Sequence, residues 1–262
     1  MQSKLQEIKN RRTDFTDWII HWTHSKTTNA KIESSWDVLK QILRCGYLAP
    51  SMATRLVGSY GDKVNRATVR GKFPAVCFSE QNLKARLESF LADSWRYSGI
   101  GVAFEKRHLF QYGGRPVIYG DESLLERLHE DDKYLWVPYC PLPQAHREYP
   151  VDWTHEREWR ARVSECDYPG WGLTPHEGVP LVLPPIDVGD GPLISLPIIV
   201  VLNYAVADTI SDFIRSMPEY NGTNNFIKYL YEHVTELKII LLEDVSDNSK
   251  DEKWWRIETL PL

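Results

Sequence analysis

Apolar and polar residues alternate along several stretches of the chain, which is the pattern of half-buried β-strands. In DWIIHWTH, Trp18, Ile20 and Trp22 share one face, while His21 and Thr23 share the other. Further strands are predicted, from alternation or from short apolar runs, in FPAVCFSE, IGVAFEK, RPVIYGD, WTHEREWRARV, LISLPIIVVLNY and KIILLEDV. We therefore expect a fold built around a β-sheet.

Apolar residues at helical spacing predict helices between these strands. In SSWDVLKQILRCG, Ser34 or Ser35 is suited to cap the start of a helix and Gly46 to end it. The apolar stripe of this helix is formed by Trp36, Leu39, Ile42 and Leu43. Other helices are predicted in NLKARLESFLADS, AVADTISDFIRSM and NNFIKYLYEHVTEL, and a short polar helix in residues 1–12.

Glycine and proline mark the connections. A turn at Gly113 and Gly114 separates IGVAFEK from RPVIYGD, and residues 166–192 are rich in both residue types and predict an extended connection. The strands and helices after this connection predict a C-terminal layer on the same sheet.

Composition indicates a globular protein. The chain has 262 residues, of which 42% are hydrophobic and 26% charged, which suits one large domain or a domain with an appendage. The net charge of −5 argues against a protein that binds duplex DNA over its whole surface. One basic segment, DKVNRATVRGK, carries Lys63, Arg66, Arg70 and Lys72 against a single Asp62. It is either a local nucleic-acid contact or a solvated loop.

The sequence contains no metal-site or membrane signature. The four cysteines form no C-x-x-C pair, and HEREW has Trp159 where the second histidine of a zinc-protease motif must stand. The N-terminal residues lack the apolar region of a secretory signal. The longest apolar run is short and is interrupted by Pro197 and Asn203. We expect a cytoplasmic protein with no bound metal and no membrane contact.

Two glutamates in WTHEREWRARV are the leading candidates for chemistry. On a strand, Glu156 and Glu158 share a face with Arg160 and Arg162, and Trp159 points to the core. Two carboxylates on one wall of a cleft can divide the work, one stabilising a cationic sugar-like transition state and the other serving a nucleophile. On a helix, the same residues form Glu–Arg pairs at i,i+4 on an exposed face.

Polar residues beside two other predicted strands are further candidates. His21 and Thr23 alternate with tryptophans on the first strand, as on a strand that borders a pocket. Ser79 and Glu80 follow a buried strand, which is a common position for site residues. A strand histidine is more often a structural residue than a site residue.

Five segments, ILRCGYLAPS, FPAVCFSE, RYSGIGVAFEK, GGRPVIYGD and HEREWR, occur in the order seen in the AbiGi-like abortive phage-infection family. The resemblance covers about residues 15–165. The same layout resembles the DarT-type and CmdT-type ADP-ribosyltransferases that modify nucleic acids, in which a histidine-containing strand comes first and a late strand carries the catalytic glutamate.

The resemblance implies roles for individual residues. It makes Glu158 the catalytic glutamate and Glu156 an accessory residue that serves the acceptor. The implied contacts to NAD, which is consumed as a co-substrate, come from His21, Thr23, Arg66 or Arg70, Ser79 and Tyr97.

The implied fold is α+β, with an ADP-ribosyltransferase-like split, mainly antiparallel sheet and flanking helices. It is expected as a single domain over residues 1–262, with a core at about 15–165 and a C-terminal α/β extension at about 190–262. The implied function is a phage-defence toxin that transfers ADP-ribose from NAD to RNA or DNA and is neutralised by an antitoxin protein. The alternatives are a non-enzymatic antitoxin or binding component, and an NAD glycohydrolase with water as the acceptor.

Overall fold

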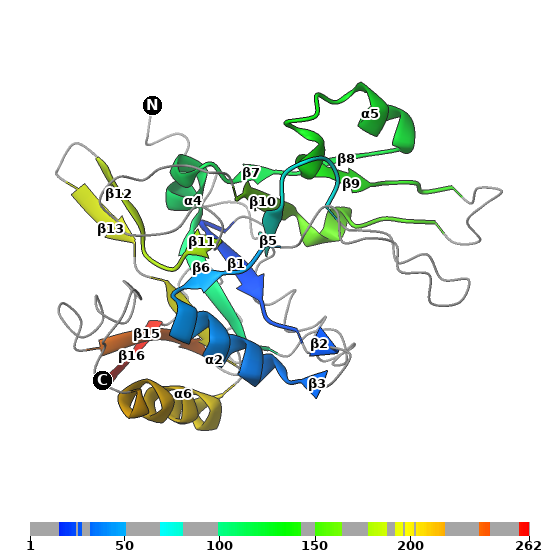
Figure 1. Ribbon diagram of the computed structural model, residues 1–262. Helices are drawn as coiled ribbons and strands as arrows, with labels where there is room; N and C mark the ends of the chain where they lie inside the picture. The colour runs from blue at the N-terminus through cyan, green and yellow to red at the C-terminus, as the bar shows by residue number, and fades with distance from the viewer. Residues whose placement is uncertain are drawn as a thin grey trace, which may run out of the picture.

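A computed structural model of the chain describes residues 16–24, 26–27, 32–50, 69–80, 99–142, 150–163, 178–187, 192–195, 197–201, 203–217, 236–241 and 257–261. Within this part of the chain, eight strands form one sheet in the order β16-β15-β14-β6-β1-β5-β10-β7 (Figure 1). The strands are β1 (Trp18–Trp22), β5 (Ala75–Ser79), β6 (Gly101–Glu105), β7 (Arg115–Pro116), β10 (Glu158–Arg162), β14 (Ile198–Val201), β15 (Glu236–Leu241) and β16 (Ile257–Pro261).

Neighbouring strands of this sheet are antiparallel except for β14 and β15, which are parallel. The expected α+β class and the mainly antiparallel sheet are confirmed. The C-terminal strands are part of the same sheet, because β14 pairs with β6 through Ile198 and Ala103. They therefore extend the sheet beside β1 and β6, as the sequence pattern predicted.

The register of the central strands decides which side chains share a face. Ile20 on β1 and Glu158 on β10 both lie opposite Ser79 of β5. Residues directly opposite each other in a ladder point to the same side. We call the side of Ile20, Ser79 and Glu158 the Glu158 face. The opposite side, which carries Ile19 and Phe78, is the helical face.

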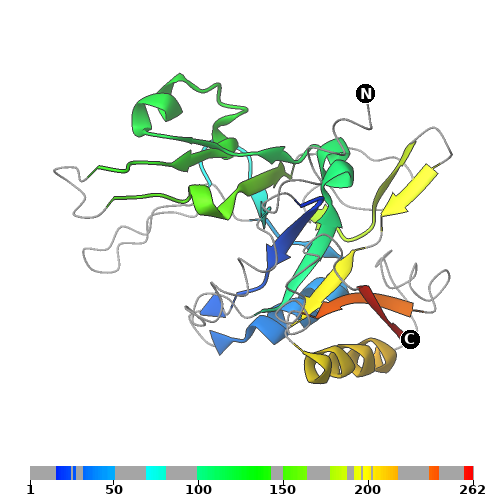
Figure 2. The same ribbon diagram turned by 180° about the vertical axis from the view of Figure 1, so that it is seen from behind.

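The helical face holds the largest group of buried apolar residues. Three helices pack on it: α2 (Ser35–Cys45), α4 (Lys106–Tyr112) and α6 (Tyr204–Ser216). Seen from both sides, α2 and α6 lie at the end of the molecule where β14 and β15 run (Figures 1 and 2). Amphipathic helices of this kind are stable because they bury their apolar stripe against the sheet.

The part of the Glu158 face next to β5 and β10 is covered by short elements. The turn η1 (Lys133–Leu135) brings Tyr134 and Leu135 against Ala75. It leads into β9 (Trp136–Pro138), which pairs in parallel with β8 (Ile118–Gly120). The helix α5 (Glu122–Arg127) joins this region and buries none of its side chains.

The remaining elements are short two-stranded ladders and one turn. They are β2 (Lys26–Thr27) with β3 (Ile32–Glu33), β4 (Tyr47–Leu48) with β11 (Val179–Pro180), β12 (Leu183–Asp187) with β13 (Pro192–Ser195), and the turn η2 (Thr154–Glu156). The predicted extended connection over residues 166–192 thus contains the strands β11 and β12. Its proline-rich composition concealed them.

Three other expectations need correction. LISLPIIVVLNY is not one strand: its first residues belong to β13, which pairs with β12, and Ile198–Val201 form β14 of the main sheet. RPVIYGD is not one strand: β7 pairs with β10 and β8 pairs with β9, because the chain bends between Pro116 and Ile118. The helix α4 follows β6 directly, where no helix was predicted, and it ends at Gly113 with φ 112. The helices predicted for residues 1–12 and 82–94 lie outside the described residues. So do residues 224–235 of the helix predicted for 224–237, whose last two residues instead begin β15.

Candidate active site

The two glutamates lie where a tight turn leads into the central strand β10. Glu158 is the first residue of β10, so the exposed-helix alternative for this segment is wrong. Glu156 is not on the strand, however, because it ends the turn η2. Arg157 between them has φ 45 and ψ 51, a left-handed conformation that costs an arginine about 1 kcal/mol or more. The two glutamates therefore do not share one strand face as expected, because Glu156 lies in a turn and Glu158 lies on a strand.

Strand β5 holds this turn from one side. The Ser79 hydroxyl donates to the backbone carbonyl of Glu156 at 2.9 Å, and the Glu80 N–H donates to the carbonyl of Arg157 at 3.2 Å. Both bonds join residues that are far apart in the sequence. They fix the end of the turn against the carboxyl end of β5.

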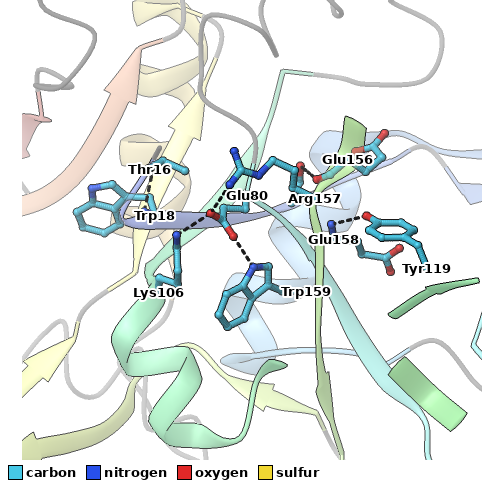
Figure 3. A network of polar contacts seen from close by, with 10 residues as sticks. Thr16, Trp18, Glu80, Lys106, Tyr119, Glu156, Arg157, Glu158 and Trp159 are labelled. Atoms are coloured by element: carbon cyan, nitrogen blue, oxygen red, sulfur yellow. Dashed lines mark hydrogen bonds and ion pairs between the residues drawn. The ribbon is translucent and has the colours of Figure 1, made fainter. Parts of the chain in front are cut away.

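The segment around β7 and β8 holds the start of β10 from the other side. The Val117 N–H donates to the carbonyl of Glu158, and the Glu158 N–H donates to the Tyr119 hydroxyl, each at 3.0 Å. Glu158 thus has both backbone groups engaged by this segment. Figure 3 shows the Tyr119 ring beside the Glu158 side chain.

A buried arginine contacts the Glu158 carboxylate. Arg160 Nε lies 2.7 Å from Glu158 Oε1, and only 2% of the arginine side chain is exposed. Arg160 Nη1 also donates to the carbonyls of Tyr134 and Trp136, at 2.6 and 3.1 Å. These contacts satisfy a guanidinium that burial would otherwise make costly. The Glu158 side chain keeps 18% exposure, so it is partly accessible from outside.

Two weak acids near Glu158 stay protonated at neutral pH. Burial raises the pKa of Tyr119 to about 12, and the charges of Glu158 and Glu156 act on the phenol in the same direction. Burial also raises the pKa of the Cys77 thiol to about 12, and the Glu158 charge adds to this rise. The site therefore combines two partly buried carboxylates with a neutral phenol and a neutral thiol. Such a set can stabilise a developing positive charge and can accept a proton.

The structure separates two predicted NAD contacts from this site. His21 lies on the helical face, where its ring meets Phe78 with centroids 5.9 Å apart and its Nδ1 lies 2.9 Å from the Cys77 carbonyl. Thr23 is 1% exposed, and its hydroxyl donates to the Ile100 carbonyl at 3.0 Å. The Thr23 hydroxyl is thus directed into the protein and away from the surroundings of Glu158. His21 and Glu158 do not share one wall of a cleft, because the alternation of the strands places them on opposite faces.

Of the other predicted NAD contacts, Ser79 and Arg70 are among the described residues. Ser79 is part of the site through its bond to Glu156. Arg70 belongs to a segment on the Glu158 face, since its neighbour Val69 packs with Ala75. Arg70 Nε is buried without a hydrogen-bond partner among the described residues. Arg66 and Tyr97 lie outside the described residues.

A second polar cluster lies on the helical face of β10 (Figure 3). Glu80 Oε1 accepts hydrogen bonds from Lys106 Nζ at 2.7 Å and from Arg157 Nη2 at 3.2 Å. Glu80 Oε2 accepts one from Trp159 Nε1 at 2.6 Å. Glu80 is 7% exposed, and these three donors offset the cost of burying its charge. The position of Glu80 after a buried strand made it a candidate site residue in the sequence. The sequence did not indicate which residues it contacts.

Tyr119 is the site residue that sequence reasoning missed. It lies in RPVIYGD, which reads as one strand, and nothing in that pattern links it to Glu158. The two residues are 39 positions apart and meet only because β7 pairs with β10 and the chain then bends.

Among the described residues, no group of His, Cys, Asp and Glu side chains is placed to hold a metal ion. No helix in the same part of the chain has the length and apolar character needed to cross a bilayer. Comparison of the chain with known protein families, with functionally described proteins and with solved structures found no match.

Proposed function

We propose that this chain is an enzyme that transfers ADP-ribose from NAD to an acceptor, with Glu158 as the catalytic residue. The observation that carries the proposal is the position of Glu158 at the start of a central strand, where its backbone N–H donates to the Tyr119 hydroxyl at 3.0 Å and Glu156 lies two residues before it. Both carboxylates are partly buried, with 14% and 18% of their side chains exposed. The AbiGi-like and DarT-type resemblance of residues 15–165 supports the same assignment.

Transfer of ADP-ribose requires one bond to break and one to form at C1′ of the ribose. The bond between C1′ of the ribose and the nicotinamide nitrogen breaks, and its electron pair leaves with nicotinamide. Glu158 stabilises the resulting oxocarbenium ion through its negative charge, and its rigid attachment to the sheet limits the reorganisation required. A hydroxyl or amine of the acceptor then bonds to C1′, and Glu156 accepts the proton that this group loses.

The Glu158→Gln variant tests the proposal. It keeps the shape of the side chain and removes its charge, and one preorganised electrostatic contact of this kind is worth about 10²–10³ in rate. We expect nicotinamide release from NAD to fall by that factor, and toxicity on expression to disappear. The matched control is Glu126→Gln on α5, where the glutamate is exposed. Circular dichroism and thermal melting check that both variants are folded.

Nicotinamide release by the wild-type protein and by Glu158→Gln decides whether the proposal holds. The proposal is refuted if the wild type releases no nicotinamide at millimolar NAD, or if Glu158→Gln releases it at the wild-type rate.

A nucleic acid is the acceptor we propose. The described end of the basic segment, Val69–Lys72, packs on the Glu158 face through Val69. Incubation with labelled NAD and separate pools of RNA, DNA and protein identifies the acceptor. Label in the protein pool would redirect the proposal to a protein substrate. Nicotinamide release without labelled product would make the protein an NAD glycohydrolase.

One observation favours a second candidate, a non-enzymatic binding protein such as the antitoxin of a defence pair. The Glu158 carboxylate is paired with Arg160, as a purely structural glutamate would be. On this alternative, Glu158→Gln lowers the melting temperature, because it leaves a buried guanidinium without its counter-charge. NAD would then neither bind nor react, which calorimetry and the nicotinamide assay measure directly.

A further inference from the structure

The residue between the two candidate carboxylates has an unusual backbone. Arg157 is the non-glycine residue with positive φ among the described residues, and it stands between Glu156 and Glu158. Residues with a Cβ atom avoid this conformation because the Cβ approaches the following carbonyl. A side chain kept there must be held by its surroundings, and such residues cluster at functional sites.

Glu80 forms two hydrogen bonds with Arg157. Its own backbone N–H donates to the Arg157 carbonyl at 3.2 Å, and its carboxylate accepts from Arg157 Nη2 at 3.2 Å. The carboxylate is itself fixed by Lys106 and by the indole of Trp159. Glu80 is thus a rigid, buried anchor next to β5. It approaches the turn from the helical face, opposite to the face of the Glu158 side chain.

The conformation of Arg157 decides where both carboxylates point. With Arg157 left-handed, the chain turns from η2 into β10, and Glu158 enters the strand opposite Ser79. An extended residue at position 157 would lengthen the strand backward and change the direction of Glu156. In a strand, each one-residue change of register moves every side chain to the other face.

We propose that Glu80 is a positioning residue of the active site. It holds Arg157 in the left-handed conformation and so fixes the positions of Glu156 and Glu158 near Tyr119. This inference rests on the proposed catalytic role of Glu158. It assigns a function to a buried carboxylate that the chemistry itself does not use.

Substitutions at position 157 separate conformation from charge. Arg157→Gly and Arg157→Ala both remove the guanidinium, but only glycine adopts positive φ without strain. We expect Arg157→Ala to lower kcat for nicotinamide release by about 10²-fold, as small misplacements of catalytic groups do. The Arg157→Gly variant should be faster than Arg157→Ala, and KM for NAD should change little in either.

Rescue is the decisive measurement. Glu80→Gln keeps the side-chain shape but removes the charge that attracts Arg157, so it should lose activity as Arg157→Ala does. Adding Arg157→Gly to Glu80→Gln should restore part of that loss, because glycine no longer needs the anchor. If Glu80 served only general stability, adding Arg157→Gly to Glu80→Gln would restore no activity. Equal activities of Arg157→Ala and Arg157→Gly, or a double variant no better than Glu80→Gln, would overturn the inference.

A second readout does not depend on catalysis. Hydrogen exchange by NMR reports the Glu158 N–H, which donates to Tyr119. It should exchange faster in Glu80→Gln and Arg157→Ala than in the wild type, and slow again when Arg157→Gly is added to Glu80→Gln. This pattern in a protein without NAD turnover would support the anchor and reject the proposed enzyme. Unchanged exchange in Glu80→Gln would reject the anchor whatever the activity.

Discussion

Cys77 illustrates how neighbouring groups set the chemistry of one side chain. It lies on β5 opposite Arg160, and part of the residue reaches the surface. Loss of water around the thiol nevertheless raises its pKa to about 12, and the Glu158 charge acts in the same direction. The thiolate, which is the reactive form of cysteine, is therefore almost absent at neutral pH.

This leads to a prediction about thiol reactivity. Iodoacetamide at pH 8 should alkylate the exposed Cys45 well before Cys77, as peptide mass spectrometry would show. The rate at Cys77 should keep rising as the pH approaches 12, because a raised pKa shifts formation of the thiolate to higher pH. In urea the two cysteines should react alike. Labelling of Cys77 as fast as Cys45 in the folded protein would contradict the burial of its thiol.

The helix α2 shows an element whose ends are set by local residues. Ser34 and Asp37 form a reciprocal capping box: the Ser34 hydroxyl accepts from the Asp37 N–H, and Asp37 accepts from the Ser34 N–H, both at 3.1 Å. The Asp37 pKa is lowered, first by its bond to Lys40 and then by Ser34. At the other end Gly46 has φ 76, which suits glycine and closes the helix with a bond to the Ile42 carbonyl.

The cap gives a prediction at the scale of this element. Ser34→Ala removes an acceptor for an N–H group at the start of the helix, and such caps are worth about 1 kcal/mol. Urea unfolding should show a loss of that size. Gln41→Ala, an exposed change in the same helix, is the control and should have little effect because alanine is an equally good helix former. If both variants had the same midpoint, the cap would not contribute to stability.

At the scale of the whole molecule, the C-terminal strands complete the sheet. β14 covers the edge of β6, and the apolar residues of β14, β15 and α6 belong to the same buried group as those of β1 and β5. An uncovered strand edge beside an exposed apolar face favours aggregation. The described strands and helix of the C-terminal extension, β14, β15 and α6, are therefore part of the core, and the central strands of the sheet depend on them.

A truncation tests this dependence. A chain ending at residue 190 should be poorly soluble and should lose cooperative unfolding, because it exposes the β6 edge and one side of the core. Co-expression of residues 191–262 as a separate chain should restore solubility, which distinguishes a missing layer from damage at the cut. A truncated chain that unfolds cooperatively at the wild-type midpoint would make the extension an appendage.

Local patterns in the sequence determined much of the framework. The alternation in DWIIHWTH predicted that Ile20 and Trp22 share a face, and they pack together there. The capped helix α2, the strand β10 with Trp159 and Ala161 facing the core, and the helix α6 were predicted as well. These features depend on residues a few positions apart. Their periodicity and caps can therefore be read without knowledge of the fold.

Tertiary structure alone decided the composition of the site. Tyr119 reaches Glu158 across 39 positions, and Glu80 reaches Arg157 across 77, so no local pattern could reveal either contact. The strand register placed His21 on the face opposite to Glu158, although both had been expected at one site. The left-handed Arg157 broke the alternation that predicted two glutamates on one strand. Its bonds to Glu80 come from a residue 77 positions away, which the local sequence does not indicate.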